Sequence, residues 1–268
     1  GRKDLRSIEH QTVLLQTTRE RAFRTDPCRY GASVTAFILA MAMAFAFALT
    51  NGFHDAANAI ATLVATRAAR PLPAVTLAAV CNLLGPLLLG AAVANTIEKI
   101  VQVPPDQTIA VIGAGLTGAV AWNLFTWIKG LPSSSSHALV GGLVGAALLD
   151  AGASAVYWGG IEDGRPVGVL GTLIALAVSP ILGLLGAALL TLLVRRLLRR
   201  ASVRIEGTVR SSQWFTSGWL AFSHGANDAQ KTVGIVVALL LAHGTISTLA
   251  SPVWVELACA TAVTVGTM

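Results

Sequence analysis

Two short polar stretches place a carboxylate inside otherwise apolar sequence. NGFHDAANA, residues 51–59, carries Asp55, and HGANDAQK, residues 224–231, carries Asp228. An ionised Asp at the centre of a membrane helix costs about 2.5–3.5 kcal/mol on insertion scales, so each carboxylate needs compensation. One such residue alone could cap a helix or bond a neighbouring amide. Two in matching contexts favour a pair of oxygen ligands for a cation or a proton.

A run of hydroxyls offers complementary chemistry. In GLPSSSSHALVGG, Pro132 interrupts the chain, four serines from Ser133 to Ser136 follow, and a helix is predicted to start near His137. The free N–H groups and the positive dipole end of a helix bind oxyanions, and hydroxyls add donors. In a soluble protein such a run would be a linker. Between membrane segments its backbone must be buried or line a wet cavity, which favours a binding site.

Three histidines flank these motifs, namely His54, His137 and His224. Imidazole titrates near physiological pH, so each is a candidate proton shuttle. A histidine held by hydrogen bonds for structural reasons is an equally good interpretation of each one alone. The three cysteines are isolated in sequence, which predicts neither a disulfide framework nor a thiolate metal site.

Composition places the motifs in a membrane. The 268 residues are 54% hydrophobic and 12% charged, with a mean hydropathy of +0.69, which fits poorly with a soluble protein. Several windows reach the roughly 20 apolar residues that cross a hydrocarbon core, and strand-like alternation is absent. We therefore predict an all-α, multi-span integral membrane protein. The formal charge of +6 forms no basic stripe interleaved with aromatic residues, which argues against nucleic-acid binding.

Apolar segments divide the chain into predicted crossings. They lie at about 32–66, with a polar interruption after residue 50, and at 72–97, 107–128, 138–150, 168–194, 214–242 and 252–268. The segment at 138–150 is too short to span alone, and with the preceding serines it predicts a broken or re-entrant hairpin. The predicted domains are a poorly ordered N-terminal extension, a first transmembrane repeat, a basic cytoplasmic loop and the start of a second repeat, at 1–30, 31–194, 195–213 and 214–268.

The distribution of Lys and Arg predicts the orientation. With the hairpin counted as one crossing, the inside loops hold Arg67, Arg70, Lys129 and the basic run at 195–204, as the positive-inside rule requires. Only the extension at 1–30 disagrees, because its seven positive charges would lie outside.

The two carboxylate motifs form an internal repeat. NGFHDAANAIAT returns 173 residues later as HGANDAQKTVGI, with Gly52 over Gly225 and Asp55 over Asp228. Five predicted crossings separate the copies, an odd number, so the second copy enters the membrane from the opposite face. Such an inverted repeat is the architecture in which transporters build a midplane site from discontinuous helices.

With both motifs and the serine hairpin in hand, residues from about 35 to 268 resemble the inorganic phosphate transporter (PiT) family, most closely its bacterial low-affinity members. The paired G-A-N-D-type signature of that family corresponds to NGFHDAANA and HGANDAQK, and its P-x-S-[ST]-[ST]-H motif corresponds to PSSSSH. The resemblance implies a helical inverted-repeat symporter that moves inorganic phosphate with a coupling ion across the cytoplasmic (inner) membrane.

Carried over by position, the resemblance implies two overlapping sets of binding residues. Those expected near the phosphate are Ser134, Ser135, Ser136, Asn58, Asp55 and Asp228. Those expected to handle the coupling ion or proton are Asp55 and Asp228 by the resemblance, joined by Lys231, His54 and His224 on the chemistry of their own side chains. No catalytic residue, metal site or cofactor is assigned. The resemblance also covers uptake of phosphate as a neutral metal-phosphate complex, which the residues neither support nor exclude.

The chain departs from the family pattern at two points. Sodium-coupled members carry Asn where this chain has Lys231, and an ammonium group cannot ligate Na⁺ but supplies positive charge in its place. We therefore expect H⁺ as the coupling ion. The chain also stops at Met268, before the second serine hairpin that the family pattern expects, so it reads as a C-terminally truncated fragment.

Different functions stay open. A sulfate permease of the same fold would offer a tetrahedral oxyanion the same donors, although a carboxylate accepts a hydrogen bond only from protonated phosphate. A phosphoester hydrolase would need a cluster of metal ligands beside the serines, and none is predicted, so we do not expect an enzyme. The chain could also be an inactive fragment or a membrane scaffold. The expected partners are inorganic phosphate and membrane lipid, and a homodimer is one possible assembly.

Overall fold

The computed structural model describes residues 27–89, 100–162, 164–248 and 250–268. Most of the predicted extension at 1–30 therefore lies outside the described residues. The chain divides into two units, 1–39 and 40–268. The described part of the first unit is the beginning of helix α2, where Ile38 and Leu39 are exposed.

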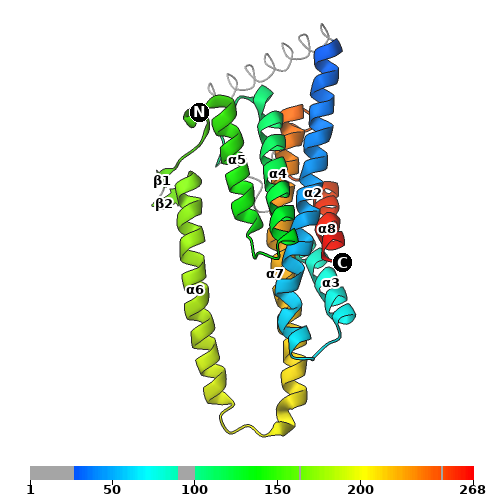
Figure 1. The fold of residues 1–268 in the computed structure, drawn as a ribbon, viewed down its shortest axis with the longest axis vertical. Helices are drawn as coiled ribbons and strands as arrows, with labels where there is room; N and C mark the ends of the chain where they lie inside the picture. The colour runs from blue at the N-terminus through cyan, green and yellow to red at the C-terminus, as the bar shows by residue number, and fades with distance from the viewer. Residues whose placement is uncertain (1–26, 90–99, 163, 249) are drawn as a thin grey trace, which may run out of the picture. The chain divides into compact units, whose positions relative to one another are not determined.

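The described residues are mainly helical, as predicted. The helices are α2 (Pro27–Ala65), α3 (Pro71–Leu89), α4 (Pro105–Ile128), α5 (Ser135–Ala151), α6 (Gly168–Leu197), α7 (Glu206–His243) and α8 (Val253–Thr267), with short 3-10 turns η2 (Ala153–Ala155) and η3 (Val203–Ile205) (Figure 1). The prediction of an all-α fold was wrong in one detail, since strands β1 (Gly160–Glu162) and β2 (Arg165–Val167) pair as a small antiparallel hairpin. Gly164 in the connection has a φ of 73°, which a glycine adopts without strain.

Four of the described helices are long and apolar enough to cross a membrane. They are Val34–Ala65, Pro71–Leu89, Asp106–Ile128 and Gly168–Leu197. Helices α5 and α8 are apolar but shorter, as expected for the segment after the serines. Helix α7 is 38 residues long and contains the most deeply buried stretch of the bundle, residues 232–240.

Helices α2 and α7 run without interruption through the two carboxylate motifs. The predicted discontinuous helices were wrong here, because α2 continues for 39 residues and α7 for 38. Neither motif contains a proline, so nothing removes a backbone donor from the helix. The chain does break at the serines, where residues 129–134 separate α4 from α5. The loop expected at 195–213 is also shorter, because Leu and Arg favour the helix and α6 continues to Leu197.

Glycines let the backbones of α3 and α7 contact each other directly. A Cβ atom at Gly225 would lie 2.2 Å from the carbonyl oxygen of Asn82 in α3. One at Gly85 would lie 2.3 Å from the carbonyl oxygen of Phe222 in α7. Small residues at such contacts allow helices in membranes to approach closely and gain van der Waals contact. The motif glycine at Gly225 therefore serves close packing, and it does not break the helix.

The same contact occurs between α2 and α8. A Cβ at Gly52 would lie 2.2 Å from the carbonyl oxygen of Val263, and one at Gly266 would lie 2.2 Å from that of Leu49. The two contacts are related by equivalent pairs of residues: Gly52 and Gly225, Leu49 and Phe222, Gly85 and Gly266, and Asn82 and Val263. In the first two pairs, the two residues are separated in sequence by the same number of positions as the two motifs. The other two pairs have a different sequence separation, which they share with each other. The internal repeat thus extends from the sequence motif to the helix packing.

We predict that Gly85→Ala destabilises the protein, because the new methyl group would meet the backbone of α7. Overpacking of this kind costs about 1–3 kcal/mol. Thermal unfolding in detergent should show a lower melting temperature. Gly183→Ala is the matched control, since nothing lies within 4 Å of its new Cβ and Ala favours the helix. Equal melting temperatures for both variants would contradict the assigned packing.

Candidate functional site

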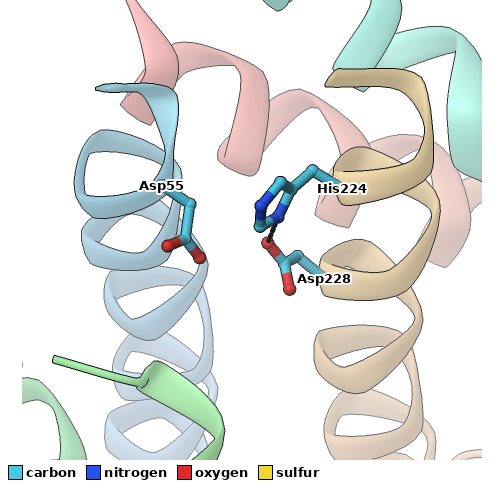
Figure 2. A group of neighbouring side chains, drawn as sticks. All are labelled: Asp55, His224 and Asp228. Carbon is cyan, nitrogen blue, oxygen red and sulfur yellow. Dashed lines mark hydrogen bonds and ion pairs between the residues drawn. The ribbon is translucent and has the colours of Figure 1, made fainter. Parts of the chain in front are cut away.

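The two predicted carboxylates meet between α2 and α7. A ligand atom from each of Asp55, His224 and Asp228 lies within 4.8 Å of the other two. Figure 2 shows Asp55 on one helix pointing toward His224 and Asp228 on the other. Asp228 is 3% exposed, and Asp55 is partly buried. The structure therefore brings the two copies of the motif together in one place.

Asp228 is compensated by two side chains of its own helix. Lys231 Nζ lies 2.8 Å from Oδ1 of Asp228, and His224 Nδ1 lies 3.3 Å from Oδ2. The partners stand three residues after and four residues before Asp228, where side chains share a helix face. The Lys231 side chain is only 16% exposed, so little solvent screens the ion pair. Both oxygens of Asp228 are thus engaged by nitrogen groups.

Asp55 has neutral neighbours at the equivalent positions. Asn58 takes the place of Lys231, and its Nδ2 donates a hydrogen bond to Oδ1 of Asp55 at 3.2 Å. Asn51 takes the place of His224 and is fully buried, with no hydrogen-bond partner for its amide among the described residues. Amide groups do not neutralise a carboxylate. The unmatched negative charge of the cluster therefore resides at Asp55.

The cluster has a donor set for a cation, but its charges restrict where one can bind. Two carboxylates and a histidine are suitable ligands for a metal cation, and each of them can also bind a proton. A cation bound to Asp228 would compete with the ammonium group of Lys231 at 2.8 Å. Among the described residues no lysine or arginine forms an ion pair with Asp55, and His224, with a ring nitrogen within 4.8 Å of this carboxylate, competes there only when it is protonated. The arrangement therefore favours uptake of positive charge on the α2 side.

His54 is directed to α4. Its Nε2 lies 2.7 Å from the carbonyl oxygen of Asn123, so this nitrogen is the donor. The Asn123 side chain donates in turn to Thr50 Oγ1 at 3.3 Å, and the Phe53 ring packs on Trp127 with centroids 5.1 Å apart. These contacts join α2 to the C-terminal half of α4. They favour the structural interpretation of His54, because within the described part of the chain no carboxylate bonds to its ring to support a proton-shuttle role.

The serine turn is held by the same part of α4. Trp122 Nε1 donates to Ser133 Oγ at 3.0 Å. Ser134 caps α5, because its Oγ accepts a hydrogen bond from the backbone N–H of His137 at 3.4 Å. The helix start that the sequence predicted at this point is confirmed, two residues earlier than expected. Helix α4 thus contacts both the carboxylate helix and the serine turn.

The serines differ in exposure. Ser134 is exposed, Ser135 is buried and Ser136 is partly buried. Among the described residues, the backbone N–H groups of Ser135 and Ser136 have no acceptor within α5 and are available to an anion, whereas that of His137 is bonded to the Ser134 side chain. This end of α5 has the donors that a tetrahedral oxyanion needs.

Sequence reasoning missed several residues that organise the site. Asn82 and Asn123 are buried polar residues within apolar helices, and the Asn82 amide donates to Thr267 Oγ1 at 2.9 Å. A lone amide in an apolar segment was the available signal, since polar residues inside membrane helices are costly and seldom without a role. Trp122 gave no comparable signal, because aromatic residues are common near the ends of membrane helices.

A bundle of apolar helices that encloses two repeat-related carboxylates, together with a hydroxyl-rich helix start, is the architecture of a membrane transporter for small ions. Residues 51–268 match the phosphate transporter family. The chain therefore belongs to that family, in agreement with the resemblance deduced from its motifs.

Known relatives support the assignment. Probable low-affinity inorganic phosphate transporters of Rhizobium meliloti and Mycobacterium bovis are each 42% identical over 85% and 86% of this chain. The low-affinity inorganic phosphate transporter PitA of Escherichia coli is 37% identical over 77% of it. The chain spans 66%, 54% and 46% of these three relatives. All are transporters, which agrees with the prediction that the chain is not an enzyme.

A solved structure has the same fold. The sodium-dependent phosphate transporter superposes with a TM-score of 0.71 at 25% identity, covering 87% of this chain and 74% of its own. The predicted membrane-protein class is confirmed by this similarity together with the four described helices that are long and apolar enough to cross a membrane.

We predict that Lys231→Met strongly destabilises the protein, because it leaves the buried Asp228 with His224 alone. Breaking a buried ion pair from one side costs about 3–5 kcal/mol. The double variant Lys231→Met/Asp228→Asn should recover much of the loss in thermal unfolding. Lys129→Met is the control, because this lysine is exposed and should change stability by about 0.5 kcal/mol or less. A single variant as stable as that control would rule out a compensating role for Lys231.

Proposed function

We propose that the protein is a proton-coupled symporter of inorganic phosphate in the cytoplasmic (inner) membrane. The observation that favours a proton as the coupling ion is the ion pair between Lys231 and Asp228, which is 2.8 Å long and largely shielded from solvent. A tethered ammonium group already neutralises one of the two repeat-related carboxylates. Family membership and the relatives' names support phosphate as the substrate.

In the proposed mechanism, Asp55 carries the coupling proton. An ionised carboxylate repels a phosphate anion, whereas a protonated one is neutral and donates a hydrogen bond. Protonation of Asp55 and binding of phosphate then strengthen each other, and this coupling is reciprocal. Lys231 remains charged through the cycle and balances Asp228. His224, 3.3 Å from Asp228, is the second group able to accept a proton there.

The proposed phosphate site is the start of α5. Ser134, Ser135 and Ser136 supply hydroxyls, the first turn supplies N–H groups, and Asn58 adds an amide beside Asp55. Helix α4 connects this site to the proton site, because it contacts α2 through His54 and the serine turn through Trp122. Movement of α2 on protonation therefore reaches the serine turn through one helix.

The proposed transport cycle relies on inverted repeats, with residues 31–194 and 214–268 contributing to the first and second. The equivalent glycine contacts of α2 with α8 and of α7 with α3 support this division. Two structurally related halves around a central site can rock between inward-open and outward-open states. The serine hairpin and the carboxylate motif of the first repeat would move together.

Sodium coupling is the competing function with a specific observation in its favour, because the structural relative is a sodium-dependent phosphate transporter. Two more hypotheses compete with the proposal, namely sulfate as the substrate and transport of a metal-phosphate complex. One uptake experiment distinguishes all of them.

We predict that proteoliposomes containing the protein take up radiolabelled phosphate when an inward proton gradient is imposed without Na⁺. Excess sulfate should not compete, because it has no protonated oxygen and cannot donate a hydrogen bond to the acceptor oxygen that protonated Asp55 retains. Uptake that requires Na⁺ and ignores the pH gradient would overturn proton coupling. A strict requirement for Mg²⁺ would instead indicate the metal-phosphate complex, and competition by sulfate a broader oxyanion carrier.

We also predict that Lys231→Asn makes phosphate uptake responsive to Na⁺. The substitution gives the second motif the amide that Asn58 provides in the first, so Asp228 loses its built-in cation.

Asp55→Asn should abolish proton-driven uptake, while phosphate binding persists, since a neutral amide resembles the protonated carboxyl group. Ser212→Ala, which removes an exposed hydroxyl on α7 outside both motifs, is the control. Proton-driven uptake by Asp55→Asn at the normal rate would exclude Asp55 as the proton carrier.

A further inference from the structure

The end of α6 carries a basic cluster that the transport site does not use. Its members are arginines on the last helical turn and just beyond it, namely Arg195, Arg196, Arg199 and Arg200. Together with four leucines they line a hollow of about 920 Å³: Leu189, Leu192, Leu193 and Leu197. The lining of this hollow therefore combines cationic and apolar side chains.

Helix α6, which leads to the basic cluster, is apolar and exposed. Its 30 residues have the highest hydropathy of the four candidate spans, and none of its membrane window is buried. Every side chain from 181 to 200 is exposed. A helix that is apolar all round is expected to be surrounded by protein or by hydrocarbon. At 1.5 Å per residue it is about 45 Å long, longer than the roughly 30 Å hydrocarbon core, so its basic end extends to the level of the lipid headgroups.

The four arginines have no anionic partner among the described residues. The nearest acidic residue along the chain, Glu206, is paired with Arg210 at 2.9 Å. The guanidinium groups are thus available to an external anion. Arginine binds phosphate groups through two parallel hydrogen bonds, which a lysine cannot reproduce.

We propose that this hollow binds an anionic phospholipid, with its phosphodiester group on the arginines and an acyl chain along the leucines. Charge complementarity selects an anionic headgroup, and the leucine wall selects a lipid over free inorganic phosphate. This proposal is independent of the transport mechanism. It differs from the general rule that positive residues fix the orientation of a membrane protein, because it requires selectivity among headgroups and among cationic side chains.

Native mass spectrometry of the full chain in detergent tests the proposal. We expect phosphatidylglycerol to bind at least about tenfold more tightly than phosphatidylcholine with the same acyl chains. Arg199→Gln/Arg200→Gln should remove this preference. Arg199→Lys/Arg200→Lys, which keeps the charge, should lose several-fold in affinity because the paired hydrogen bonds are lost. The control is Arg67→Gln/Arg70→Gln, which removes two exposed arginines from another connection and should bind like the wild type.

Three results would overturn the lipid site. They are equal binding of the two lipids, an equal loss in the control variant, and full displacement of phosphatidylglycerol by millimolar inorganic phosphate. The last result would identify a site for the free anion. A Lys variant that binds like the wild type would reduce the cluster to a simple charge signal for membrane orientation.

Discussion

Repulsion between Asp55 and Asp228 is the constraint that the rest of the bundle must satisfy. Two unit charges about 5 Å apart repel by about 3–4 kcal/mol at an effective dielectric constant of 20, and burial raises the cost of each charge separately. The ammonium of Lys231, at 2.8 Å, offsets most of this on the α7 side. Without it, one of the two carboxylates would have to take up a proton or another cation.

Glycine packing sets the positions of the helices that carry this charge cluster. At Gly52 the backbone of α2 contacts that of α8, and at Gly225 the backbone of α7 contacts that of α3. In both places a Cβ atom would clash with the backbone of the partner helix. Because each glycine lies three residues before its aspartate, the helix that makes the close contact also presents the carboxylate. Substitutions in the packing and substitutions in the charges are therefore expected to influence each other.

Much of this arrangement was predictable, and the failures have physical causes. The membrane segments, the start of α5 after the serines and the meeting of Asp55 with Asp228 followed from hydropathy and from the repeat. The continuity of α2 and α7 did not, because whether polar residues interrupt a membrane helix depends on partners in other helices. The direction of His54 was also hidden, since adjacent residues on a helix point to different sides and spacing alone does not identify the partner.

The asymmetry between the two motifs bears on how many ions must accompany phosphate. In the proposed mechanism phosphate adds negative charge near Asp55, so positive charge must enter with it to avoid repulsion in a site of low dielectric constant. If both aspartates had only amide neighbours, two external cations would be needed to neutralise them. Lys231 supplies one of these permanently, because it is part of the chain and moves with Asp228. In the proposed mechanism a single substitution, from the amide of the first motif to the ammonium of the second, thus lowers by one the number of external cations the cycle requires.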